Sequence, residues 1–209
     1  MSLLNTGVWE KKGGSGTMSR SSFYGAVGLI LAWGLGVSGY MAQEFSTAQF
    51  SGGQALMLCL LPFVGIFMAM GGAVLSAIGY HLVVIPFGML LGPVLAHFEI
   101  AHPGIVYNAA YMTGSITLIM GVSGFLFPDF YRRIGGALFV ALLGLVIIRV
   151  VQIFLPFEFG LLEYFAAGLF SLYIGFDMWR ASEIEPTMDN AVDIALSLYL
   201  DILNLSSSF

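Results

Sequence analysis

Long apolar segments separated by short polar ones run through almost the whole chain. Their pattern predicts seven helices, with expected ranges of 23–42, 54–77, 80–97, 104–126, 134–155, 160–180 and 188–205. A helix needs about 20 mostly apolar residues to cross a bilayer, and these segments approach that length. We therefore expect an all-α integral membrane protein with seven transmembrane helices and short loops.

Composition supports this class. The chain is 58% hydrophobic and 9% charged, and its mean hydropathy of +0.92 excludes a water-soluble fold. Residues 1–22 are polar and are expected to form a flexible cytoplasmic tail, followed by a single seven-helix domain over residues 23–209. The one cysteine, Cys59, excludes a disulfide within the chain.

The distribution of Lys and Arg over the loops predicts how the protein is oriented in the membrane. Six of the seven basic residues precede the first helix or lie in loops on the same side: Lys11, Lys12, Arg20, Arg132, Arg133 and Arg180. Because positive charges accumulate on the cytoplasmic side, the N-terminus is expected there. Arg149 falls inside the fifth predicted helix, where it either extends outward toward Glu158 or Glu163 or pairs with a carboxylate of the core.

Two aspartates stand at membrane depth. Asp177 lies near the end of the sixth predicted helix, and Asp201 lies deep inside the seventh. Carboxylates are costly within the hydrocarbon layer, and those found there usually serve a function. The working hypothesis is that this pair does so.

The seventh helix carries a polar stripe. Asp193, Ser197 and Asp201 recur at intervals of four residues, and Asn204 lies close to the same face. Such a face turns toward protein or water rather than lipid. We therefore expect this helix to be central and surrounded by the other six. At its start, Thr187 is a plausible N-cap for the helix.

The spacing of the two acids allows them to meet. Asp177 and Asp201 are equidistant from position 189, and the loop between their helices centres about one helical turn earlier. Two adjacent carboxyl groups away from water would share one proton over some range of pH. Loss of that proton would leave two repelling acceptors suited to a hard cation such as Ca²⁺.

Other chemical signals are weak. His81, His97 and His102 are expected at helix ends, and no two of them have the spacing of a helical metal site. The sequence contains no phosphate-binding loop, nucleotide fingerprint or nucleophile motif. We expect no enzymatic activity, no nucleic-acid partner and no tightly bound cofactor.

Two stretches resemble a known family. SLYIGFDMWR at 171–180 and ALSLYLDILNL at 195–205 are similar to the signature of the transmembrane Bax inhibitor motif family. The resemblance implies that Asp177 and Asp201 are the pH-sensing pair of a calcium leak pathway and bind calcium transiently. Tyr173, Asp193, Ser197 and Asn204 are interpreted as the supporting polar face.

The chain also departs from the family pattern. Some members carry a basic residue in the second helix that contacts the aspartate pair, whereas residues 52–80 here contain no Lys or Arg. Arg180 or Arg149 would have to replace it, or the aspartate pair has no basic partner.

The function expected from these observations is a pH-sensitive calcium or cation leak channel or exchanger in a bacterial plasma membrane. Protons and calcium would be its ions, and the lipid bilayer its surroundings. Two alternatives stay open. One is a scaffold that regulates other membrane proteins. The other is an intramembrane aspartyl protease, although the chain has only IGFD at 174–177 in place of GxGD and lacks a PAL motif.

Overall fold

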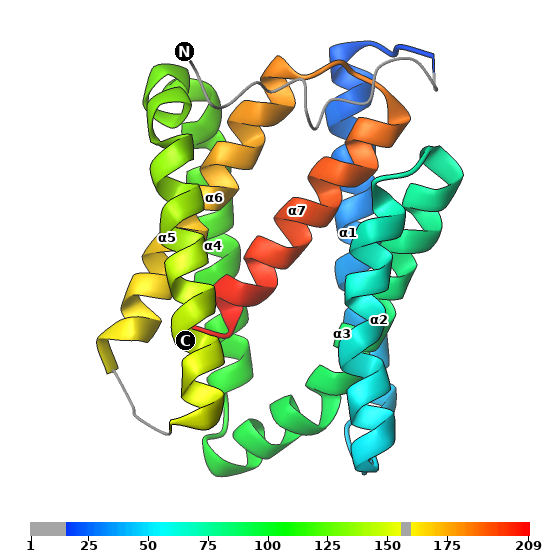
Figure 1. Ribbon diagram of the computed structural model, residues 1–209, viewed down its shortest axis with the longest axis vertical. Coiled ribbons are helices and arrows are strands. Elements are labelled where there is room, and N and C mark those ends of the chain that lie inside the picture. The colour runs from blue at the N-terminus through cyan, green and yellow to red at the C-terminus, as the bar shows by residue number, and fades with distance from the viewer. Residues whose placement is uncertain (1–15, 156–159) are drawn as a thin grey trace. The chain divides into compact units, whose positions relative to one another are not determined.

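The computed structural model describes residues 16–155 and 160–209, which form seven α-helices without any strand (Figure 1). Most of the expected tail, residues 1–15, lies outside this described part. The helices are α1 (Arg20–Glu44), α2 (Gly52–Ala69), α3 (Ala73–Ala101), α4 (Ile105–Leu126), α5 (Pro128–Phe154), α6 (Gly160–Glu183) and α7 (Met188–Ser206).

Six of these helices, α1 to α6, are long and apolar enough to span a membrane. The prediction of an all-helical membrane protein is confirmed at this level. Within the described ranges α7 does not join that set, since it contains Asp189, Asp193 and Asp201 in only 19 residues. Its full crossing of the membrane and its central position stay predictions.

The α1 and α5 helices begin earlier than the sequence suggested, for identifiable reasons. The α1 helix starts at Arg20 because the hydroxyl of Ser19 accepts a hydrogen bond from the backbone N–H of Ser22, at 3.1 Å. The α5 helix starts at Pro128 rather than near 134. Proline suits a first helical position, where no backbone N–H is needed, so Arg132 and Arg133 belong to the first turns of α5 and not to a loop.

The turn between α2 and α3 was predicted in the wrong place. Apolar residues continue through the true break, which falls at residues 70–72 and contains Gly71. Gly79, expected near the turn, lies inside α3 and faces Gly65 of α2. A Cβ on Gly65 would lie 2.5 Å from the carbonyl oxygen of Gly79, so both positions must be glycine for the helices to approach this closely.

Contacts divide the described chain into two compact units. Unit 1 contains residues 109–184 and 200–209, and unit 2 contains residues 16–108 and 185–199. The α7 helix contributes its first part to unit 2 and its last part to unit 1. Within unit 1, α5 packs on α6, and within unit 2, α3 packs on both α1 and α2. The expectation of a single domain stays a prediction.

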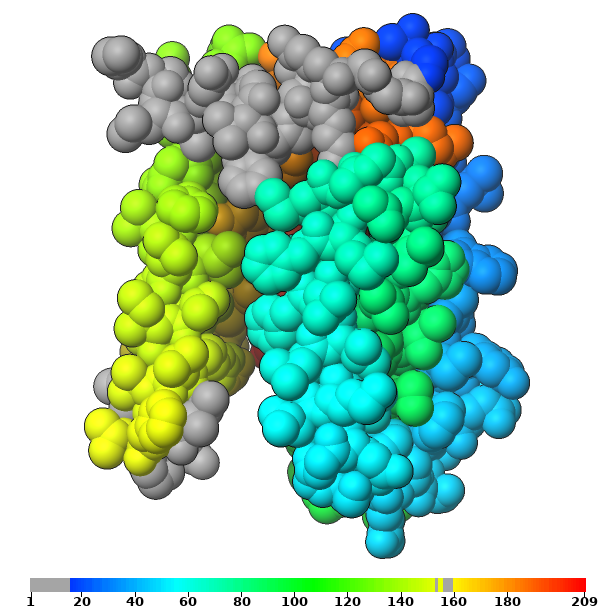
Figure 2. Space-filling view, turned by 45° about the vertical axis from the view of Figure 1, so that its right-hand side comes forward, coloured from blue at the N-terminus to red at the C-terminus, as the bar shows by residue number. Residues whose placement is uncertain are grey.

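Unit 2 has a tightly packed interior and an apolar exterior. Tyr80, Val83 and Val84 of α3 are almost completely buried. Figure 2 shows α2, in cyan, at the surface of this unit, and its Phe63 and Phe67 are 62% and 73% exposed. Apolar side chains on the outside of a helix bundle are what contact with lipid requires.

Candidate functional site

The segment of α6 that carries Asp177 is held in place by close helix contacts. A Cβ on Gly175 would overlap the ring of Tyr131 in α5, and one on Gly124 in α4 would meet the carbonyl oxygen of Gly175. The hydroxyl of Tyr131 is also hydrogen-bonded to that of Ser123. These small residues let α4, α5 and α6 approach one another, which fixes the position of Asp177 within unit 1.

The structure brings the two predicted carboxyl groups together. Asp177 is 4% exposed and Asp201 is 8% exposed, and a side-chain hydrogen bond joins them. Both residues belong to unit 1. Among the described residues the second oxygen of Asp201, Oδ2, has no hydrogen-bond partner. The geometry that the sequence allowed is therefore present.

Arg180 is the basic residue next to this pair. Its Nη1 lies 3.9 Å from Oδ1 of Asp177, one helical turn away, and its side chain is 22% exposed. Arg149 instead forms an ion pair with Glu163, with 2.7 Å between Nη2 and Oε2, and both side chains are almost half exposed. Its outward extension was the correct interpretation, and its pairing with a carboxylate of the core was wrong.

The four residues expected to support the aspartate pair differ in their exposure and in the unit to which they belong. Tyr173 lies one turn before Asp177, is half-buried, and interacts electrostatically with both carboxyl groups. Asn204 is exposed, and its side-chain amide donates to the backbone oxygen of Leu200 within its own helix. Asp193 and Ser197 are partly exposed and belong to unit 2. The functional roles of these four residues stay predictions.

The start of α7 has a separate polar cluster. The hydroxyl of Thr187 accepts a hydrogen bond from the backbone N–H of Asn190 at 3.2 Å, which confirms Thr187 as the N-cap. Asp189 is buried in the first turn and accepts a 2.8 Å hydrogen bond from the hydroxyl of Ser76 in α3. A carboxylate is favoured at this end of the helix dipole.

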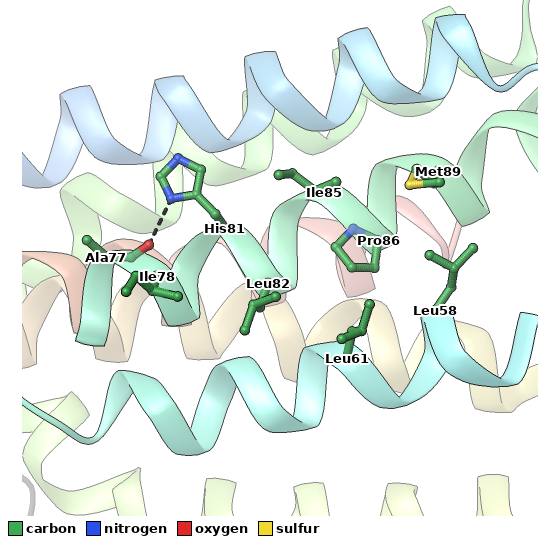
Figure 3. A pocket seen from close by; sticks show the side chains of 9 residues that line it. All are labelled: Leu58, Leu61, Ala77, Ile78, His81, Leu82, Ile85, Pro86 and Met89. Atoms are coloured by element: carbon green, nitrogen blue, oxygen red, sulfur yellow. Dashed lines mark hydrogen bonds between the residues drawn. The ribbon is translucent and has the colours of Figure 1, made fainter. Parts of the chain in front are cut away.

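A separate pocket of about 510 Å³ lies between α2 and α3 (Figure 3). Apolar side chains line it, apart from His81, which lies inside α3 and not at a helix end as predicted. The Nε2 of His81 accepts a hydrogen bond from the indole N–H of Trp33, so Nδ1 is the nitrogen that donates to the backbone oxygen of Ala77. Since both ring nitrogens are engaged, this pocket offers no ligand to a cation.

Within the described ranges no three His, Cys, Asp or Glu side chains cluster as a metal site would require. A cation at Asp177 and Asp201 would therefore need further oxygens from hydroxyl groups, carbonyl groups or water. Three further side chains of unit 1 have buried polar atoms without a partner in the described chain and were not predicted from the sequence: Thr113, Thr117 and Trp179. Their only sequence signal was the interval of four residues between the two threonines.

Comparison with known proteins identifies one family and two bacterial relatives. A family model described as "Inhibitor of apoptosis-promoting Bax1" matches residues 20–209. Uncharacterized proteins from Helicobacter pylori strains J99 and 26695 are 34% and 33% identical to the chain over 118 residues, which is 56% of this chain. That region covers 49% of each relative, so the chain spans about half the length of the curated relatives it matches.

Proposed function

The chain belongs to the transmembrane Bax inhibitor motif family of membrane proteins, and we propose that it conducts calcium or a similar cation through a pathway gated by Asp177 and Asp201. One observation carries the proposal, namely the hydrogen bond between two buried carboxyl groups. Acidic groups sequestered from lipid are typical of ion and proton pathways.

The hydrogen bond defines the closed state. An ionised carboxylate can only accept hydrogen bonds, so two carboxyl groups can bond to each other only when at least one proton is present. When that proton leaves, the pair becomes two adjacent negative charges that repel each other. Separation of the two side chains then exposes oxygens to a passing cation.

Arg180 makes the two acids unequal. Its guanidinium lies beside Asp177, and a nearby positive charge favours the ionised form of that carboxyl group. The shared proton is therefore assigned to Asp201, which donates it to Asp177. Loss of this proton would convert Asp201 from a donor into an acceptor for the cation.

A hard cation such as Ca²⁺ fits these groups. It prefers carboxylate, carbonyl, hydroxyl and water oxygens and takes about six to eight of them. Two carboxylates supply only part of this set, so binding would be transient and partly hydrated. This suits conduction, which requires binding weak enough for the ion to leave.

The proposed location is a bacterial plasma membrane with the N-terminus in the cytoplasm. The distribution of Arg20, Arg132, Arg133 and Arg180 over one set of helix ends supports the orientation. The similarity to Helicobacter proteins supports a bacterial source for this kind of chain.

Calcium flux into proteoliposomes that contain the purified protein, measured from pH 5 to 8, tests this function. Flux through the unmodified protein should rise with pH, because deprotonation opens the pair. In Asp201→Asn the amide still donates to Asp177 but cannot lose a proton, so flux should stay low at every pH. Asp129→Asn is the matched control, since it removes the same charge from a side chain of α5 that is 81% exposed.

Equal flux in Asp201→Asn and the unmodified protein would contradict the proposed gate. No flux at any pH would favour a scaffold role, in which the carboxyl pair only fixes helix packing. If the unmodified protein cleaves a membrane-spanning peptide, and both Asp177→Asn and Asp201→Asn abolish that cleavage, the protein would instead be an aspartyl protease.

A further inference from the structure

Unit 1 contains four buried polar atoms without a hydrogen-bond partner in the described chain: Thr113 Oγ1, Thr117 Oγ1, Trp179 Nε1 and Asp201 Oδ2. Thr113 is 4% exposed and Trp179 is 5% exposed. An unpaired buried polar group destabilises the folded protein, so such groups are rare and call for a physical explanation. Four in one unit suggest a shared cause.

The two threonines differ from the serines of the same unit. Ser115, Ser123 and Ser171 each donate to a backbone oxygen three or four residues earlier in their own helix. This is the usual way in which a hydroxyl is satisfied within a membrane helix. Thr113 and Thr117 do not do this, and their hydroxyl groups stay available to another partner.

By helix geometry both threonines lie on the side of α4 that meets α6 at Gly124. With 3.6 residues per turn, Thr117 is about 40° and Gly124 about 20° around the helix from Thr113. Gly124 is the position at which α4 meets Gly175 and Trp179 of α6. The two threonines therefore continue the packed face and do not point toward lipid.

Their depth places them on one side of the aspartate pair. Gly124 lies level with the segment of α6 that contains Asp177. At 1.5 Å per residue, Thr117 and Thr113 lie about 10 Å and about 16 Å from that level, toward the beginning of α4. In the proposed orientation this is the outer side of the membrane.

We propose that Thr113 and Thr117 line the outer part of the cation route, where their hydroxyl oxygens contact a partly hydrated Ca²⁺ between the outer side and Asp201. This inference rests on the proposed function and assigns residues to its pathway. The indole N–H of Trp179 can only donate, so its partner has to be an acceptor such as a water molecule. A hydrated interior accounts for all four atoms together.

Flux measurements on threonine variants test the route. Thr113→Val and Thr117→Val keep the side-chain shape and remove the hydroxyl group, and each should reduce calcium flux about three- to tenfold. The pH at half-maximal flux should not change, because the gate is intact. Ser115→Ala is the control, since Ser115 lies on the opposite side of α4 and bonds to its own helix.

Thiol labelling gives a second readout that does not depend on conduction. Cysteine would be placed at 113, 117 or 115 in a Cys59→Ala background and treated with a membrane-impermeant methanethiosulfonate cation. Thr113→Cys and Thr117→Cys should react quickly and Ser115→Cys slowly, because the reagent needs a hydrated thiolate.

Flux and labelling together separate this inference from the proposed gate. Unchanged flux in both valine variants, or unreactive thiols at 113 and 117, would overturn the route even if Asp201→Asn abolishes conduction. A shifted pH midpoint in the valine variants would also overturn it, because the threonines would then act on the gate. Reactive thiols combined with normal flux in Asp201→Asn would refute the gate and keep the hydrated path.

Discussion

The two units differ in whether their buried polar groups have hydrogen-bond partners. In unit 2, Ser38 bonds to Tyr199 and Val84, Ser76 bonds to Asp189, and Tyr80 bonds to a backbone oxygen of α1. In unit 1, Asp201 and three further side chains have polar atoms without a partner in the described chain. Satisfied networks make an interior rigid, whereas a buried polar group without a partner indicates a bound water or ion, strain or a functional role.

The α7 helix contains one buried aspartate from each unit, Asp189 from unit 2 and Asp201 from unit 1. Asp189 lies in its first turn, where the helix dipole favours a carboxylate and Ser76 donates to it. Asp201 lies three turns later, and its hydrogen-bond partner is another acid, Asp177. We therefore expect the chemistry of the partner, and not burial alone, to distinguish a gating aspartate from a structural one.

Removing the acid of Asp201 should have the largest effect. Asp201→Ala deletes the hydrogen bond to Asp177, whereas Asp201→Asn retains a donor. A hydrogen bond to a charged group is worth about 1.5–3 kcal/mol, so calcium flux at low pH should be about ten- to a hundredfold higher in the alanine variant. Proteoliposome flux checks this difference. Equal low-pH flux in the two variants would show that the hydrogen bond does not close the path.

Replacing Asp189 should affect stability and leave gating unchanged. Asp189→Ala removes the acceptor for Ser76 and the charge at the helix start, with an expected loss on the order of 2 kcal/mol. Thermal unfolding in detergent measures this loss, and Asp189→Asn should lose less because it keeps an acceptor. A shift in the pH dependence of calcium flux would break the contrast between the two aspartates.

Replacing Arg149 should have the smallest effect. Its ion pair with Glu163 is almost half exposed, and such pairs contribute no more than about 1 kcal/mol. Arg149→Gln should therefore change the unfolding temperature only slightly and leave flux unaltered. Arg180→Gln is the informative counterpart, since the same loss of charge beside Asp177 should shift the pH dependence of flux.

The helices could be predicted from sequence because they follow from the apolar periodicity. Counting residues from the turn showed only that Asp177 and Asp201 could meet, to within about one helical turn, and the hydrogen bond between them agrees with that prediction. The turn near Gly71 was missed because apolar residues run on both sides of it, and hydropathy alone does not locate a break. The early start of α5 was missed because its first turns contain Asp129 and two arginines, which resemble a loop.

The threonines of α4 could not be identified from sequence. A threonine in an apolar helix usually bonds to its own backbone, and only the position of each hydroxyl group shows that Thr113 and Thr117 do not. The contact between Trp33 and His81 was missed for a similar reason, because it joins residues 48 positions apart through one hydrogen bond.

The place of Asp177 along α6 has a consequence for sidedness. Glu183, at one end of the helix, is about 9 Å away along its axis, whereas Gly160, at the other end, is about 26 Å away. With the proposed orientation, the nearer compartment is the cell interior, and Arg180 stands on the short path. Protons from the cytoplasm would therefore reach the acid pair over the shorter path, while the proposed hydrated route past the threonines would connect it to the outside. Such a protein would respond most directly to the metabolic acidity of its own cell.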